Sequence, residues 1–465
     1  MSESLARRVI EDKEKGLTDE EIGAKHKVTL KFIEKVTVGK YGVNISDVKR
    51  PIKVSRLFAP IDDKLQTTTV WSFKSRGSWA THNGNYRGNW SPYIPRNVIK
   101  RYSKEGDLVL DYFCGAGTTG VECKLLGRNF IGIDINPAAI KLAKQNVDFN
   151  IGTIFRPADA NVIDFRVGDA RNLAGIADDS IDLICAHPPY SDILHYTENN
   201  PADLSHLAVQ DFLREMDKVA AESIRVLKDG KYCAILIGDM RKNKRVVPLG
   251  FWTIERFLNA GFRLKELIIK RQHNCKTTGF WYNNSIKFNF LLLAHEYLAI
   301  FQKDSGEAVI KPREKKFDLN FSVVKPELES TTVWIFSPDN WLTKTISNLV
   351  HRYNGKKYAI FEFENAEGPD LDLAIIKYNK DIKKSLRLAE KDLKPGATLA
   401  IICEDVRTKT GTIYSQSIEL EKLLRESARF KIQEIVIVSR ERADLVESES
   451  CLSIIHNGVL VYSKC

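Results

Sequence analysis

The sequence predicts an α/β protein whose main domain is a doubly wound parallel sheet with an antiparallel hairpin at its edge. Short apolar runs such as Leu108–Leu110 alternate with segments of helical periodicity between residues 96 and 258. This alternation is typical of a sheet covered by helices on both faces. The last two runs, Phe262–Ile269 and Phe288–Phe301, follow each other without a helical pattern between them, so they predict the antiparallel hairpin.

The length predicts more than one domain. The chain has 465 residues, whereas a single hydrophobic core usually stops growing at ~250–300 residues. A proline-containing stretch of weak periodicity, Asp47–Pro60, separates the N-terminal segment from the sheet pattern. We therefore expect a small helical unit with its linker at 1–60, the main domain at 61–305, and a second, degenerate α/β copy at 306–465.

The composition favours a polyanionic partner and argues against a metal or membrane site. Lysine and arginine number 70 and aspartate and glutamate 60, which gives a net charge of +10 and a pI near 9.0. Such a balance suits nucleic acid without requiring it. The eight cysteines form no CxxC pair, so no metal site is expected. No apolar run reaches the ~18 residues of a membrane span, and we expect a cytoplasmic protein.

The N-terminal segment has the pattern of two short helices. Val9 and Ile10 belong to one apolar face, and Thr18 with Glu21 forms a capping box before a second helical pattern. The spacing resembles a DNA-binding helix-turn-helix. An ordinary helical hairpin packed on the next domain fits the pattern equally well.

Residues 67–100 combine many aromatic and cationic side chains with glycine and proline. A segment of this kind can wall a ligand site, or it can cover the edge of a sheet, and the composition leaves both open. Trp71, Thr81 and Tyr86 are its candidates for ligand contacts.

The strongest functional signal lies in the stretch from Asp107 to Pro137. A buried-strand pattern ends in Asp111, a turn with Gly115 and Gly117 follows, and a second apolar run ends at Asp134, 134 − 111 = 23 residues after Asp111. In nucleotide-binding folds the glycines let the backbone approach a ligand, and an acid ~20 residues further on can hold ribose hydroxyls. Taken alone, the two glycines fit a simple tight turn as well.

Polar side chains follow the ends of several predicted strands. Asp111, Asp134, Asp169 and His187 each come directly after an apolar run, and Pro188–Tyr190 continues the last of them. Ligands of doubly wound sheets bind at the carboxyl ends of the strands. We therefore expect these residues to share one site.

Three motifs together resemble the exocyclic-amine (N6-adenine/N4-cytosine) DNA methyltransferases that use S-adenosylmethionine. The loop is similar to the family's FxGxGTT motif, and residues 187–190 are similar to its [DNS]PP[YF] tetrapeptide. Residues 294–303 resemble a HEYL…F.K strand of the same group. Here the cofactor loop precedes the PPY tetrapeptide. The loop residues that carry the match are Phe113, Gly115, Gly117, Thr118 and Thr119.

The resemblance implies a Rossmann-like methyltransferase sheet, S-adenosylmethionine as cofactor, and double-stranded DNA with a flipped target base as substrate. It assigns the methionine end of the cofactor to the loop from Asp111 to Thr119, the ribose hydroxyls to Asp134, and the adenine amine to Asp169. It assigns catalysis to His187, Pro188, Pro189 and Tyr190.

The chemistry of that tetrapeptide depends on hydrogen-bond acceptors. An exocyclic amine is a poor nucleophile because its lone pair is delocalised into the ring. In the family, the carbonyl between the prolines and the side chain before them accept the amine's hydrogen bonds, while the aromatic residue stacks on the flipped base. His187 departs from the usual Asp, Asn or Ser. A neutral imidazole can accept, so activity is expected to fall as His187 titrates; alternatively, His187 is a spacer beside a working Pro188 carbonyl.

The last third of the chain repeats the first two in outline. Thr331–Phe336 echoes Thr68–Phe73, and Leu393–Arg407 echoes Leu227–Arg241. The copy contains no glycine loop, and residues 376–378 stand near the place of the PPY tetrapeptide. These echoes predict a degenerate copy that binds no cofactor and serves as an internal pseudo-dimer partner in holding nucleic acid. Chance echoes between two α/β domains are the alternative.

The function expected from these features is site-specific DNA methylation on N6 of adenine or N4 of cytosine. An RNA base methyltransferase of the tRNA guanine type is one alternative. A DNA-binding regulator with a vestigial methyltransferase fold is another. A restriction or defence partner is possible on the same resemblance, and either a monomer with an internal pseudo-dimer or a homodimer is compatible with the sequence.

Overall fold

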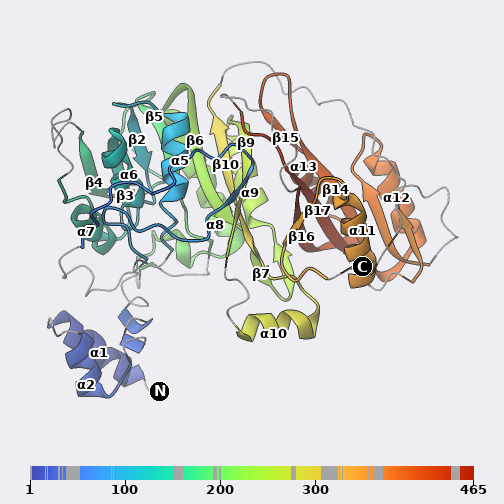
Figure 1. Ribbon diagram of the computed structural model, residues 1–465, viewed down its shortest axis with the longest axis horizontal. Helices are drawn as coiled ribbons and strands as arrows, with labels where there is room; N and C mark the ends of the chain where they lie inside the picture. The colour runs from blue at the N-terminus through green and yellow to red at the C-terminus, as the bar shows by residue number, and fades with distance from the viewer. Residues whose placement is uncertain are drawn as a thin grey trace.

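The computed structural model contains two large sheets beside each other and a helical unit apart from them (Figure 1). Among the described residues, no helix is long and apolar enough to cross a bilayer. The residues outside the description are 1–2, 16, 18, 30–31, 34, 38–52, 85, 87, 151–160, 192–195, 198–199, 274–278, 305–322, 324, 327, 354–355, 361–369 and 441–450.

The N-terminal unit contains α1 (Glu3–Glu14) and α2 (Asp19–His26). Val9, Ile22 and Ile33 form a small apolar core of its own. Figure 1 draws this unit apart from both sheets. Thr18 of the predicted capping box lies outside the described residues, and a DNA-binding role for the unit stays a prediction.

The first sheet has eight strands in the order β1-β9-β10-β6-β5-β2-β3-β4. All neighbours pair in parallel except β10, which is antiparallel to both β6 and β9. The doubly wound sheet predicted from the sequence is therefore confirmed. The strands are β1 (Val70–Ser72), β2 (Leu108–Asp111), β3 (Asn129–Asp134), β4 (Ile163–Val167), β5 (Ile181–Ala186), β6 (Leu227–Gly238), β9 (Arg263–Arg271) and β10 (His295–Gln302).

The predicted hairpin is β9 and β10, and two of its details differ from the prediction. It lies one strand in from the edge, because β1 pairs with the outer side of β9. The connection between its strands contains α10 (Gly279–Phe288), which the sequence did not indicate. The mixed aromatic and polar composition of that segment hid the helix. A separate short hairpin, β7 (Met240–Lys242) with β8 (Arg245–Val247), follows β6.

Helices cover both faces of this sheet because the strand side chains alternate between two apolar cores. One core joins the strands to α8 (Val209–Val226) and α9 (Leu249–Asn259). The other joins them to α5 (Tyr93–Tyr102), α6 (Thr118–Leu126) and α7 (Pro137–Asn146). The alternation follows from the period-2 geometry of strands, and it leaves the carboxyl ends of β2, β3 and β5 open for a site.

The second sheet repeats the first with fewer strands. Its order is β11-β16-β17-β14-β13-β12, and β17 is antiparallel to both neighbours, as β10 is in the first sheet. In the described residues, β3 and β4 have no counterpart. The strands are β11 (Val333–Phe336), β12 (Tyr358–Ile360), β13 (Leu371–Lys377), β14 (Leu393–Arg407), β16 (Phe430–Arg440) and β17 (His456–Lys464), with β15 (Ile413–Ser415) paired to β14. Its helices are α11 (Trp341–Arg352), α12 (Ile382–Asp392) and α13 (Gln416–Leu424).

The two sheets exchange matching contacts across their junction. Thr69 Oγ1 lies 2.8 Å from His456 Nδ1, and Thr332 Oγ1 lies 2.8 Å from His295 Nδ1. The peptide amide of Thr69 donates to the Ser453 carbonyl, just as that of Thr332 donates to the Leu292 carbonyl. The contacts therefore follow an internal pseudo-two-fold relation. This relation, with the repeated strand order, favours a duplicated fold over chance echoes.

Two buried ion pairs obey the same relation. Arg241, just after the end of β6, donates to Glu434 of the second sheet at 2.5 Å. Arg407, at the end of β14, donates to Glu266 of the first sheet at 2.6 Å. Glu434 also accepts from the Leu291 amide, and Glu266 accepts from the Leu452 amide. Both carboxylates are buried, so each pair helps to hold the two halves in one arrangement.

Glu434→Ala is expected to lower the free energy of unfolding by about 3 kcal/mol, because it leaves Arg241 in the interior without its partner. Glu266→Ala should cost a similar amount through Arg407. Guanidinium denaturation followed by tryptophan fluorescence measures both, with the exposed Glu426→Ala as control, for which we expect less than about 0.5 kcal/mol. Denaturation midpoints equal to that of the control would contradict a stabilising role for these pairs.

Candidate active site

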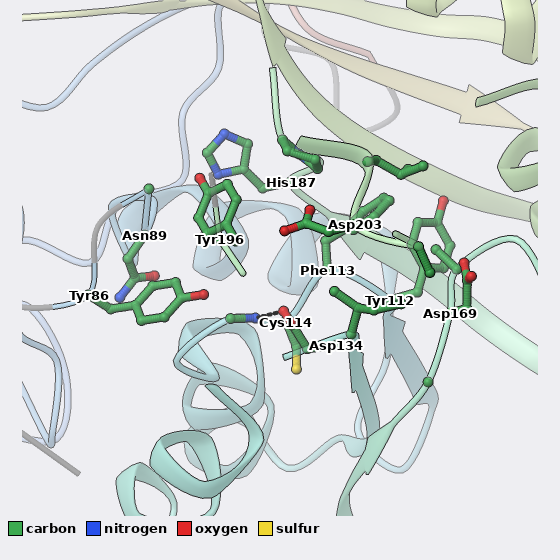
Figure 2. Close-up of a pocket in the computed structure, with 18 of the residues that line it drawn as sticks. Tyr86, Asn89, Tyr112, Phe113, Cys114, Asp134, Asp169, His187, Tyr196 and Asp203 are labelled. Carbon is green, nitrogen blue, oxygen red and sulfur yellow. Dashed lines mark hydrogen bonds between the residues drawn. The ribbon is translucent and has the colours of Figure 1, made fainter. Parts of the chain in front are cut away.

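A pocket lies at the carboxyl ends of β2, β3 and β5 (Figure 2). We call it the loop pocket. Figure 2 shows Tyr196 and Asp203 projecting between His187 on one side and Asp134 on the other. The predicted site residues in its wall are Phe113, Gly115, Asp134, Asp169, His187 and Pro189. The fold thus brings these six predicted site residues together in one pocket.

The glycine loop needs its glycines for two different reasons. Gly115 has φ +49°, and a Cβ there would lie 2.9 Å from the Tyr86 ring, so a side chain would push into the pocket wall. Gly117 has φ +80° and is the N-cap of α6. A Cβ on Gly117 would lie 2.9 Å from Ala143 of α7, so this glycine permits helix packing and lies away from the pocket.

Asp111 lies beneath the loop. Its Oδ1 accepts from the Phe113 amide at 3.0 Å and its Oδ2 accepts from Thr119 Oγ1 at 2.6 Å. Burial raises the pKa of Asp111 to about 7. Thr118 instead donates to the Asn89 side chain. Asp111, Gly117, Thr118 and Thr119 are not among the residues of the pocket wall, and their assignment to the cofactor by resemblance stays a prediction.

Asp134 and Asp169 occupy different electrostatic surroundings. Asp134 accepts from the amides of Gly115 and Asn136, each at 2.9 Å, and burial raises its pKa to about 6. Burial also acts to raise the pKa of Asp169, but hydrogen bonds from Arg171 outweigh it and lower the pKa overall. Asp169 is in the wall, with its carboxylate already paired to Arg171 at 2.6 Å.

Several wall residues were missed by sequence reasoning. Asp203 receives hydrogen bonds from Thr197 and from the Ser205 amide at the start of the short 3₁₀ helix Leu204–His206. Tyr196 stacks near Tyr86, with ring centroids 6.4 Å apart. A cap residue before a short helix is a common local feature, so the sequence around Asp203 carried no signal that pointed to a site.

The aromatic segment before α5 serves both of the purposes that its composition allowed. Trp79, His82 and Arg96 all bond the fully buried Glu122 of α6, at 2.6, 2.7 and 2.8 Å. Further along, Tyr86, Asn89 and Trp90 enter the pocket wall. Trp71 is fully buried in the core, and Thr81 donates to the Asn146 carbonyl. Of the three candidates for ligand contacts in this segment, only Tyr86 reaches the wall.

A second pocket adjoins the loop pocket at His187 and contains the rest of the tetrapeptide. We call it the aromatic pocket. His187 stacks on Trp90 with ring centroids 5.5 Å apart and an interplanar angle of 17°. The other residues in the wall of the aromatic pocket include Phe73, Arg76, Trp90, Pro188, Tyr190, Lys270, Arg271, His273 and Glu296. The basic residues Arg271 and His273 both belong to this wall.

His187 belongs to a chain of hydrogen bonds. Its Nε2 lies 2.9 Å from the Tyr190 hydroxyl, which donates to Glu296 Oε1 at 2.8 Å. Lys270 Nζ donates to Glu296 Oε2 at 2.7 Å. Burial lowers the pKa of His187 to about 4; the charge of Glu296 opposes this, and those of Lys270 and Arg76 add to it. The imidazole is therefore neutral at ordinary pH.

This pKa corrects the pH dependence expected from the sequence. A histidine with an unperturbed pKa would become protonated near pH 6.5 and would then have no nitrogen left to accept a hydrogen bond. His187 instead stays neutral until the pH falls towards 4. We expect the rate of methyl transfer, at saturating cofactor, to show no step from His187 between about pH 5.5 and 8. Comparison with His187→Asn, which cannot titrate, isolates its contribution. A step near pH 6.5 in the wild type that vanishes in His187→Asn would contradict the lowered pKa.

Comparison with known proteins shows what the residues around this site are similar to. Residues 24–145 match a family model described as DNA methylase. Over these residues the chain is similar to the DNA methylase family. A second model, described as a methyltransferase domain, matches residues 103–277. The glycine loop and Asp134 lie within both matches, and His187–Tyr190 lie within the second.

Curated proteins that resemble part of this chain are type II methyltransferases. One from Streptococcus pneumoniae is 37% identical over 95 residues, which cover 20% of this chain and 34% of the relative. One from Lactococcus lactis subsp. cremoris is 38% identical over 95 residues with the same shares. The chain thus spans about a third of the length of these relatives. Among solved structures, an S-adenosylmethionine-dependent methyltransferase from Methanosarcina mazei is 18% identical, covers 44% of this chain and 96% of its own, and gives a TM-score of 0.31.

Proposed function

We propose that the protein is a site-specific DNA methyltransferase that moves a methyl group from S-adenosylmethionine to the exocyclic amine of a flipped adenine or cytosine. The observation that carries the proposal is the meeting of two pockets at His187. The loop pocket has the glycine cradle and Asp134, and the aromatic pocket has Pro188, Tyr190 and Trp90. A donor and an acceptor molecule placed in them would meet at the tetrapeptide.

The loop pocket fits the cofactor. A Cβ on Gly115 would lie 2.9 Å from the Tyr86 ring, so the glycine lets this ring form the pocket wall beside the loop at the end of β2. Asp134, at the end of β3, offers a carboxylate to ribose hydroxyls. Asp203, which the sequence did not reveal, offers a second carboxylate in the same wall. When bound, S-adenosylmethionine supplies an electrophilic methyl group; every other catalytic contribution comes from the chain.

The aromatic pocket suits a planar base whose amine must be held by acceptors. Trp90 and Tyr190 give it flat apolar surfaces. The neutral His187 and the carbonyl of Pro188 are acceptors at the junction of the two pockets. Neither proline has an N–H, so no backbone donor of the tetrapeptide competes with the amine. Holding the amine in this orientation in a water-poor site provides the rate enhancement, because transfer needs no covalent enzyme intermediate.

The second domain, in this proposal, is a non-catalytic copy that helps to hold DNA. By the sheet registers, Lys377–Lys380 correspond to His187–Tyr190, so the match to the PPY residues falls at 378–380, two residues later than the sequence echoes suggested. They also place Glu404 where the first domain has Gly238. A copy with these residues lacks the prolines of the tetrapeptide, and it has a glutamate at the position that is a glycine beside Tyr190 in the first domain. A restriction partner and a cytoplasmic location follow from the same proposal.

Nucleoside mass spectrometry of DNA and RNA from a host that expresses the protein tests the proposal. We expect N6-methyladenine or N4-methylcytosine in DNA above an empty-vector control, and a loss of that product with Pro189→Ala. Neither modified base in DNA would contradict the proposal. A methylated base in RNA alone would favour the RNA enzyme, and binding of S-adenosylmethionine without any product would favour the vestigial regulator.

A further inference from the structure

We propose that Glu296, acting through the Tyr190 hydroxyl, holds His187 as the tautomer protonated on Nε2, so that Nδ1 is the atom that accepts a hydrogen bond from the target amine. Glu296 and Lys270 are then positioning residues, and His187 is the catalytic acceptor. The role of Nδ1 rests on the proposed function, whereas the tautomer rests on the geometry alone.

The direction of each hydrogen bond follows from the number of protons. The pKa of Glu296 is lowered overall: burial acts to raise it, and the charge of Lys270 and the hydrogen bonds from Lys270 and Tyr190 are among the contributions that together outweigh burial. An ionised carboxylate can only accept, so the Tyr190 hydroxyl uses its single proton on Glu296 Oε1, 2.8 Å away. The Tyr190 oxygen must therefore accept from His187 Nε2 at 2.9 Å. A neutral imidazole with hydrogen on Nε2 has its lone pair on Nδ1.

The sheet fixes this chain of hydrogen bonds on both sides. Glu296 of β10 is the direct cross-strand partner of Lys270 on β9 and of Gly238 on β6. The missing side chain of Gly238 admits the Tyr190 ring, since a Cβ there would lie 2.8 Å from Tyr190 Cε2. With Lys270 on one side and the Tyr190 ring over Gly238 on the other, Glu296 accepts from Tyr190 through Oε1 and from Lys270 through Oε2.

His187 has the position that the proposal requires. It is in the wall of both the loop pocket and the aromatic pocket. In the part of the chain that the structure describes, the hydrogen bonds of its ring involve only Nε2. Nδ1 is thus the nitrogen left for a ligand.

The second domain has lost all of these features together. Its register places Asn457 at the position of Glu296, Glu404 at that of Gly238 and Lys377 at that of His187. The domain that lacks the tetrapeptide therefore lacks the carboxylate and the vacant position as well. This joint loss is what we expect if the hydrogen bonds serve the tetrapeptide and not the stability of the sheet.

Glu296→Gln reverses the chain with little change in shape. Lys270 has only donors, so the glutamine oxygen faces Lys270 and its amide NH₂ faces Tyr190. The Tyr190 oxygen then accepts from the amide, and its proton turns to His187 Nε2. The imidazole proton moves to Nδ1, which becomes a donor aimed at the amine's own hydrogens.

Long-range ¹H–¹⁵N NMR of the full chain labelled in histidine tests this directly. The chain has nine histidines, and the His187 signals are those that disappear in His187→Asn. In the wild type we expect protonated Nε2 and bare Nδ1. In Glu296→Gln we expect the opposite, while the exposed Glu426→Gln keeps the wild-type pattern. Protonated Nδ1 in the wild type, or an unchanged tautomer in Glu296→Gln, would overturn the proposal.

Kinetics separate the tautomer from the proposed function. We expect Glu296→Gln to lower the single-turnover rate of methyl transfer roughly 100-fold and to leave the Kd of S-adenosylmethionine unchanged. An unchanged rate would also overturn the proposal. If the tautomer switches as expected but the wild type methylates no nucleic acid, the proposed function fails and the geometric inference stands.

Discussion

Asp134→Ala is expected to weaken the binding of S-adenosylmethionine by about 100-fold, the equivalent of two hydrogen bonds to a charged group. Asp134 lies in the wall of the loop pocket, and its carboxylate also accepts a hydrogen bond from the Gly115 amide. Its loss therefore removes contacts to the ribose and loosens the glycine cradle. Isothermal titration calorimetry measures the Kd, with the exposed Asp148→Ala as control, and the wild type should bind one cofactor per chain.

The same binding should depend on pH, with a sign set by the raised pKa of Asp134. Above about pH 6 the group is ionised and accepts fully, and below it protonation removes an acceptor. We expect affinity to fall about tenfold from pH 7.5 to 5. A Kd for Asp134→Ala equal to that of Asp148→Ala, or two cofactor molecules bound per chain, would contradict the assignment of this site.

Gly238→Ala is expected to lower kcat about 100-fold, because a misplacement of the order of 1 Å at the reacting groups has that cost. The new methyl group would lie 2.8 Å from Tyr190 Cε2 and 3.4 Å from Glu296 Cγ. The ring must shift, and the hydrogen bond to His187 shifts with it. The cofactor Kd should be unchanged, since Gly238 is absent from the wall of the loop pocket.

The matched control for this variant is Gly175→Ala, where an added Cβ meets nothing closer than 4.0 Å. Activity is measured by transfer of a tritiated methyl group to DNA. If Gly238→Ala keeps the activity of Gly175→Ala, the space beside Tyr190 is not needed. Full activity would also remove one argument for the proposal that the second domain, which has Glu404 at the matching position, is non-catalytic.

Local features of the sequence predicted much of the site. The turn at Gly115 and Gly117 was recognisable because left-handed backbone angles select glycine wherever they occur. Asp134 and His187 were placed at strand ends because the apolar period shows where a buried strand stops. The roles of Asp111 and Thr119 could not be read in the same way, since spacing does not tell whether a side chain faces the ligand or the space beneath the loop.

Contacts between distant parts of the chain were beyond the sequence. Glu296 belongs to a motif that the sequence revealed, but its bond to Tyr190, 106 residues away, depends on the order of β5, β6 and β10. The lowered pKa of His187 depends on burial by those same strands. Asp203 and α10 lay in segments without a regular pattern.

The sequence by itself determined the alternating sheet, the glycine loop, the tetrapeptide and the echo of the first domain in the second, because backbone preference and apolar period are local properties. Only the tertiary structure decided which carboxylates face the pocket, that His187 is neutral and hydrogen-bonded through Tyr190, and that the two sheets exchange Thr69–His456 and Thr332–His295 across a pseudo-two-fold junction. Burial and hydrogen-bond direction depend on neighbours that only folding brings together, and these two quantities set the chemistry at His187.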